Sequence, residues 1–103
     1  MNRWMAAGVL LLMAGGAALA TEGPTVAMGQ ALFESPALGS NGKSCASCHP
    51  AGKGLDELGA FDDPMLKEMI NFCIRDALEG KMFALESQEL DSMLLYLRIL
   101  SQK

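Results

Sequence analysis

Five consecutive residues, Cys45-Ala46-Ser47-Cys48-His49, constrain the fold of this chain more than any other feature. They contain two of its three cysteines and its only histidine. Cysteines three positions apart lie on the same face of one helical turn, and the histidine follows them directly. The segment therefore presents two thiols and one imidazole to a single site.

The C-x-x-C-H spacing is the attachment pattern of a c-type haem. Each thiol adds to one vinyl group of the porphyrin and forms a thioether, and the histidine supplies an axial nitrogen to the iron. We therefore expect one covalent haem c, attached through Cys45 and Cys48 and ligated by His49.

Other uses of this motif fit the rest of the chain less well. A thiol–disulfide C-x-x-C motif normally accompanies a βαβ pattern, and no strand pattern is present. A closed zinc site takes four ligands, but only Cys73 and no second histidine remain to complete one. A simple disulfide would leave His49 without a role.

The first twenty residues have the layout of a secretory signal peptide. Arg3 precedes an apolar run over residues 5–17, and Ala18-Leu19-Ala20 is a small-x-small cleavage site. An uncleaved anchor is the alternative, but the run is short for a membrane-spanning helix. We expect cleavage after Ala20, export to the periplasm, and one cytochrome c domain over residues 21–103 with no membrane attachment.

Charge and size narrow the function further. The chain has a formal net charge of −4, and the leader contains no acidic residue, so the exported domain is also acidic. An acidic domain has no basic patch for nucleic acid. A domain this small usually needs a disulfide, a metal or a cofactor to complete its core. Covalent haem would meet that need, and the apoprotein is then expected to be largely unfolded.

The apolar periodicity predicts an all-α fold. Helices are expected over Val26–Glu34, from Asp63 to about Glu79, and from Ser87 to about Ser101, with one further turn at the cysteine motif. Asp63 is the expected cap of the second helix, and Gly80 is expected to end it in a left-handed conformation.

The Asp63–Glu79 helix is expected to be two-faced. The apolar face is formed by Leu66, Met69, Ile70, Cys73 and Ala77, and the polar face by Lys67, Glu68, Asn71 and Arg75. The segment before this helix contributes Leu55, Leu58 and Phe61, which are expected to form a wall of the haem site.

Three segments of the chain together resemble a known family. The Gly29–Phe33 segment, the CASCH motif and a last helix with Tyr96-Leu97 look like a small class I cytochrome c. In that family a glycine and an aromatic residue of the first helix pack against an aromatic residue of the last. The sixth iron ligand there is usually a methionine from the loop before the last helix, which implies Met82.

A closer resemblance covers Ile70 to Leu97. This stretch is similar to the N-terminal haem domain of thiosulfate dehydrogenases and related sulfur-oxidising cytochromes, with Ile-Asn-x-Cys, Gly-Lys, Ser-x-Glu and Tyr-Leu in the same order. In those domains the cysteine is the distal iron ligand, which implies Cys73. Those enzymes have two C-x-x-C-H motifs and this sequence has one, and its spacer between His49 and Cys73 is shorter.

These observations lead to a functional hypothesis with two open points. The first expectation is a periplasmic electron carrier, not an enzyme, with transient redox partner proteins. The alternative is a haem domain or subunit of a sulfur-compound-oxidising or peroxidatic enzyme. The sixth ligand is open between Cys73, which would lower the reduction potential, and Met82, which would raise it. Met65 and Met69 are better explained as core residues.

Overall fold

The computed structural model describes residues 23–102, and every regular element in this range is helical. The predicted all-α class is therefore confirmed for this range, and none of these helices has the length and apolar character to cross a membrane. The predicted signal peptide, residues 1–20, lies outside the described residues. The elements are α2 (Val26–Glu34), α3 (Cys45–Cys48), η1 (Pro50–Gly52), η2 (Asp56–Ala60), α4 (Asp63–Asp76) and α5 (Gln88–Leu100).

Among residues 23–102, helices α2 and α5 make the most extensive helix–helix contact. A side chain on Gly29 would collide with the backbone carbonyl of Ser92 and lie 2.9 Å from Cβ of Tyr96. One turn further along α2, the ring of Phe33 packs edge-on against Tyr96, with centroids 5.4 Å apart. The packing of a glycine and an aromatic residue against the last helix, expected from the resemblance, is therefore present.

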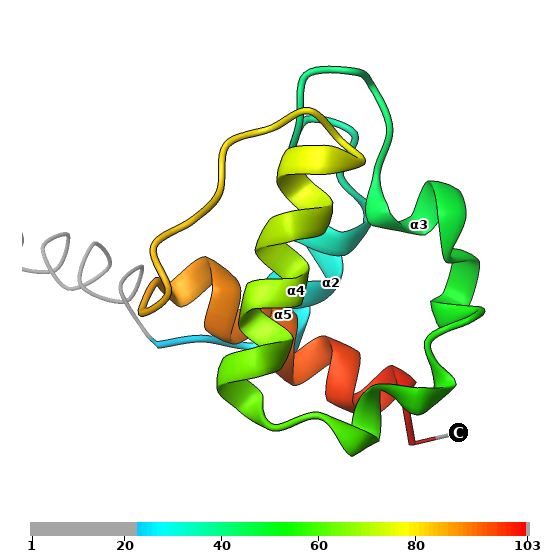
Figure 1. Cartoon of the computed structure of the whole chain (residues 1–103), viewed down its shortest axis with the longest axis vertical. Coiled ribbons are helices and arrows are strands. Elements are labelled where there is room, and N and C mark those ends of the chain that lie inside the picture. Colours follow the sequence, from blue (N-terminus) through cyan, green and yellow to red (C-terminus); the bar gives the residue numbers. More distant parts are fainter. Residues whose placement is uncertain (1–22, 103) are drawn as a thin grey trace, which may run out of the picture.

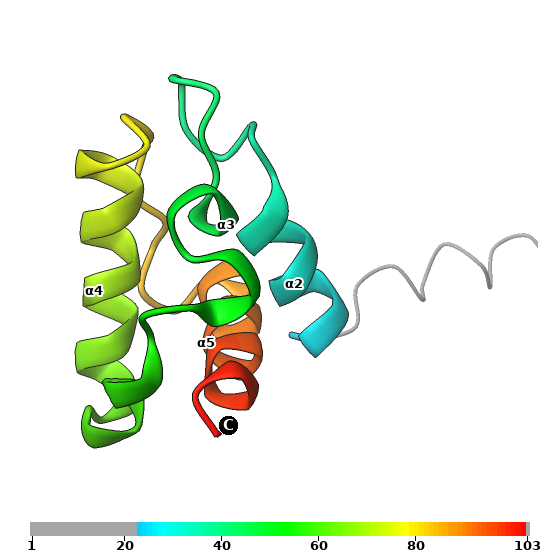
Figure 2. The ribbon, with the colours of Figure 1, turned by 90° about the vertical axis from the view of Figure 1, so that its right-hand side faces the viewer.

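Helix α4 lies beside α5, on the other side from α2 (Figure 2). Its residues Leu66, Ile70 and Ile74 are buried in the core with Leu90 and Met93 of α5. At the edge of this contact Lys67 forms an ion pair of 2.7 Å with Asp91 and donates a hydrogen bond to the Leu85 carbonyl. Lys67, predicted on the polar face, is therefore fixed against two other segments.

The predicted ends of α4 need two corrections. The helix begins at Asp63, one residue before the start that an Asp63 cap implies, and the cap is Asp62, whose carboxylate accepts from the Met65 backbone N–H. It ends at Asp76, earlier than predicted, and Glu79 rather than Gly80 has the positive φ of 55°. Glycine is needed at position 80 for a different reason. A Cβ atom there would lie 2.7 Å from Cα of Gly39, so only glycine allows the loop after α4 to approach the loop that contains Gly39.

The loop before α3 is joined to the end of α4 by hydrogen bonds. Ser40 donates from its backbone to the Leu78 carbonyl (2.9 Å) and from its hydroxyl to the Glu79 carbonyl (2.6 Å). Asn41 donates from its side chain to the Ala77 carbonyl (3.0 Å). These bonds satisfy carbonyls that the end of α4 would otherwise leave without partners. They also place that end of α4 beside the segment leading into the cysteine motif (Figure 1).

At the α2–α5 crossing, replacing glycine by alanine is expected to lower stability, whereas the same substitution in a helix usually raises it. Glycine to alanine in an exposed helix interior adds up to about 1 kcal/mol of stability. Gly29→Ala is instead expected to cost about 1–3 kcal/mol, because the added methyl group overpacks the crossing. The measurement is urea unfolding of the exported protein.

The control is Gly59→Ala, where an added side chain has no neighbour within 4 Å. It is expected to change the free energy of unfolding by less than about 0.5 kcal/mol. Equal stability of the two variants would contradict the proposed role of the crossing.

Candidate haem-binding site

A cavity of about 400 Å³ lies between the cysteine motif and α4. This volume is in the usual range for cofactor and ligand sites. Apolar side chains from α2, η2, α4 and α5 dominate the lining, and the polar ones cluster at the motif. The lining residues are Phe33, Lys43, Ser44, Cys45, Cys48, His49, Leu55, Leu58, Leu66, Met69, Ile70, Cys73, Ala77, Leu78, Met93 and Leu97.

The cysteine motif forms the single helical turn predicted from its sequence. Ser44 caps this turn: its hydroxyl accepts from the Ser47 backbone N–H, and the Ser47 hydroxyl accepts from the Ser44 backbone N–H. Ser44 is buried, and the backbone N–H of His49 closes the turn by donating to the Cys45 carbonyl (2.9 Å). Local hydrogen bonds therefore hold Cys45, Cys48 and His49 on one wall of the cavity.

The orientation of His49 leaves one ring nitrogen available. Its Nδ1 lies 2.9 Å from the Lys53 backbone carbonyl. A carbonyl can only accept, so Nδ1 carries the proton, and Nε2 keeps its lone pair for a metal. Gly54 lies against the ring with φ of 88°, a conformation that favours glycine, and a side chain there would be 3.5 Å from Nδ1.

The three thiols share this cavity. Burial raises the pKa of Cys45 to about 11, with a further contribution from Cys73. Burial, then the charge of Asp76, then Cys48 raise the pKa of Cys73. The cysteine of α4 and the two cysteines of α3 therefore line one cavity, and the raised pKa values of Cys45 and Cys73 favour the protonated thiol at neutral pH.

The two candidates for a sixth ligand lie on different sides of α4. Cys73 belongs to α4 and lines the cavity described above, which we call the haem-site cavity, together with Met69 one turn earlier. Met82 lines a second cavity, on the side of α4 that carries Glu68 and Phe72. Met65 is 49% exposed near the start of α4 and contributes to neither cavity.

Other predictions about the site were partly correct. Leu55 and Leu58 line the cavity. Phe61 does not: it follows η2 in an extended conformation, and its side chain is 38% exposed. Asn71, predicted on the solvent-facing side of α4, is 5% exposed. Its burial depends on a partner twelve residues along the chain, Phe83, which helical periodicity does not indicate.

The residues of the cavity fit a c-type haem. One wall supplies two thiols at vinyl-linking spacing and an imidazole with a free Nε2, and the other walls are apolar. Within residues 23–102, no three His, Cys, Asp or Glu side chains gather as a metal cage. Haem needs no such cage, since the porphyrin supplies four ligands and the protein at most two axial ones.

Comparisons with known proteins identify no relative. No protein-family model, curated protein or solved structure matches the chain.

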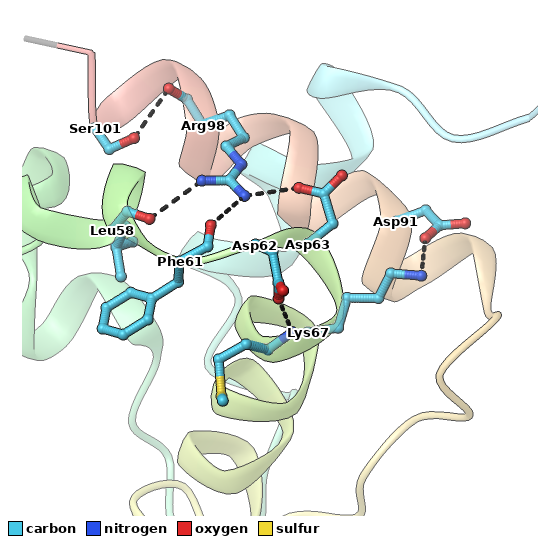
Figure 3. A network of polar contacts seen from close by, with 9 residues as sticks. Leu58, Phe61, Asp62, Asp63, Lys67, Asp91, Arg98 and Ser101 are labelled. Carbon is cyan, nitrogen blue, oxygen red and sulfur yellow. Dashed lines mark hydrogen bonds and ion pairs between the residues drawn. The ribbon is translucent and has the colours of Figure 1, made fainter.

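The part of the cavity wall that contains Leu58 is fixed by Arg98 of α5 (Figure 3). Its guanidinium donates to the backbone carbonyls of Leu58 (3.1 Å) and Phe61 (2.7 Å), and to the carboxylate of Asp63 (2.7 Å). Leu58 lines the cavity, and Asp63 begins α4. Arg98 was not singled out from the sequence, because nothing local distinguishes it from a surface arginine.

Arg98→Met is expected to cost about 2 kcal/mol of stability, since it removes charged hydrogen bonds from partly buried carbonyls. Urea unfolding measures this change. Arg75→Met is the matched control, because the Arg75 side chain is 51% exposed and its contacts are local: an ion pair with Asp76 and a position over the exposed Phe72 ring. The control is expected to cost less than about 0.5 kcal/mol. Similar losses in both variants would show that Arg98 does not support the wall.

Proposed function

We propose that this protein is an exported electron carrier of the cytochrome c type, with one haem covalently attached through Cys45 and Cys48. The observation that carries the proposal is the convergence of the C-x-x-C-H turn and the free Nε2 of His49 on one apolar cavity. The α2–α5 crossing at Gly29 supports it as well, since it is the packing expected of class I cytochromes.

The lining of the cavity also supports an apolar occupant. Because the cavity opens to the surface, an empty site would leave its apolar side chains in contact with water, which is unfavourable by roughly 25 cal/mol per Å² of apolar area. Leu58, Leu66, Ile70, Met93 and Leu97 are core residues that also line the cavity. A planar, largely apolar macrocycle would complete the core that they begin.

Each residue of the site has a distinct task in this proposal. Cys45 and Cys48 tether the group, and the Lys53 carbonyl orients the His49 ring and makes its Nε2 a stronger donor. The apolar walls exclude water, which keeps reorganisation around a changing charge small. A bound haem would supply one-electron exchange between ferric and ferrous iron.

We assign the sixth ligand to Cys73, with Met82 as the alternative. The assignment is supported by position: Cys73 faces the cysteine motif from the opposite wall, and Met82 lies behind α4. With both axial positions taken by the protein, iron would have no open site for a substrate. This favours electron transfer over the sulfur-oxidising or peroxidatic alternative.

The partner is expected to be a redox protein that docks transiently in the periplasm. Cys48 and Cys73 are exposed residues of the cavity lining, so the site opens to the surface and brings the haem edge within reach. Lys43 is also exposed and lies on the same lining. A small contact area around this opening would suit rapid association and release.

Haem attachment can be tested by mass spectrometry. Co-expressed with cytochrome c maturation machinery, the exported chain is expected to start at Thr21 and to carry the added mass of one haem. Cys45→Ser/Cys48→Ser should remove the haem, because both thioethers are lost. Cys73→Ser is the matched control and should retain it. An unmodified, colourless wild-type protein would disprove the proposed function.

The sixth ligand can be tested by absorption and electron paramagnetic resonance spectra. The wild-type ferric protein is expected to show low-spin thiolate features, and Cys73→Ser should lose them. Met82→Leu should leave them unchanged, because that side chain lies outside the cavity. The opposite pattern would assign Met82. High-spin wild-type iron that binds carbon monoxide would instead favour an enzyme.

A further inference from the structure

The connection between α4 and α5 is anchored to α4 by one buried side chain. Asn71 donates from Nδ2 to the Phe83 carbonyl (2.8 Å) and accepts at Oδ1 from the Phe83 backbone N–H (2.9 Å). Both halves of the amide are therefore paired with the backbone of a single residue. We call residues 78–87 the strap, and Figure 1 shows it descending along one side of α4 while α3 lies on the other.

This anchor lies next to Met82 in the chain. Met82 precedes Phe83 and lines the second cavity with Phe72 and Leu85, where its side chain is 43% exposed. Helix α4 lines both cavities, but with different residues. At 3.6 residues per turn, the α4 residues that line the second cavity lie on the opposite face of the helix from those, such as Cys73, that line the haem-site cavity. Met82 is thus held on the far side of α4 from the haem site.

Chain length alone would not keep Met82 there. The residues between Leu78 and Ser87, fully extended, would span roughly 28 Å. A helix with its side chains is only about 10–12 Å across. A released strap is therefore long enough to pass around the end of α4 and bring a methionine to the cavity. The Asn71–Phe83 hydrogen bonds oppose this movement directly beside Met82. Ser40 and Lys67 hold the strap on either side of that point, through the Glu79 and Leu85 carbonyls.

We infer that Asn71 is a positioning residue that selects the axial ligand: it holds the strap behind α4 and so excludes Met82 from the iron. The inference rests on the proposed haem function and deepens it. Asn71 does not line the haem-site cavity, so it acts only through the strap. By this arrangement the protein excludes a thioether, which would raise the reduction potential, in favour of the Cys73 sulfur.

The test uses the haem-loaded protein in a Cys73→Ser background, where the distal position is free to accept another ligand. Cys73→Ser alone is expected to lack the far-red charge-transfer band of an iron–thioether bond. Cys73→Ser/Asn71→Ala should gain that band, together with a higher reduction potential. Adding Met82→Leu should abolish it. Asn41→Ala is the matched control, because it removes an asparagine that bonds to Ala77 and not to Phe83.

Three results would overturn the inference. First, the thioether band could already be present in Cys73→Ser. Second, it could survive the addition of Met82→Leu. Third, it could be absent after Asn71→Ala although hydrogen exchange at the Phe83 amide shows that the strap has been released. If the alanine variant does not fold, Asn71→Asp, which loses the donor to the Phe83 carbonyl, should give a weaker band, and no band would count against the inference.

The wild-type protein separates this inference from the proposed function. A wild-type thioether band would overturn the inference and leave haem attachment intact. A colourless wild-type protein would instead remove the proposed function, and the inference with it.

Discussion

The fold depends on an apolar cavity at the position where a small domain would normally have a solid core. Leu58, Leu66, Ile70 and Leu97 are buried and also line this cavity, so the side chains that stabilise the fold are the same ones that would contact a cofactor. The core residues that do not line the cavity come from α4 and α5 and are few: Ile74, Leu90, Leu94 and Leu100. Stability and function are therefore coupled: a group that fills the cavity would supply much of the missing core, and its loss would affect the whole domain.

Helix α4 separates the two sulfur atoms that could ligate iron. Its inner face carries Cys73 toward the cysteine motif, and its outer face carries Asn71, which anchors the strap and Met82. Two further anchors fix this helix. Ser40 and Asn41 bind the carbonyls after its last turn, and Arg98 holds its first residue, Asp63, together with the wall that contains Leu58. The position of one helix thus sets both the shape of the cavity and the available ligands.

Much of the local structure could be predicted from the sequence. The bounds of α2, the single turn of the cysteine motif, the start of α4 and the Ser87 cap of α5 depend on residues within a few positions of one another, where capping and periodicity apply. The errors concern long-range contacts. Gly80 is required by the approach of Gly39 rather than by its own φ, and Asn71 is buried because Phe83 returns to it.

The sequence by itself determined the chemistry that is possible here: two thiols and one imidazole on a single turn, and a third cysteine on the apolar side of a later helix. These are matters of spacing along the chain, and the turn keeps that spacing in the fold. Only the tertiary structure decided which distant groups meet. It placed Cys73 in the same cavity as His49, paired the His49 ring with the Lys53 carbonyl, and placed Met82 in a different cavity. The physical reason is that these positions depend on how helices and loops pack. Packing brings together residues that are far apart in the sequence, and no local sequence pattern indicates such contacts.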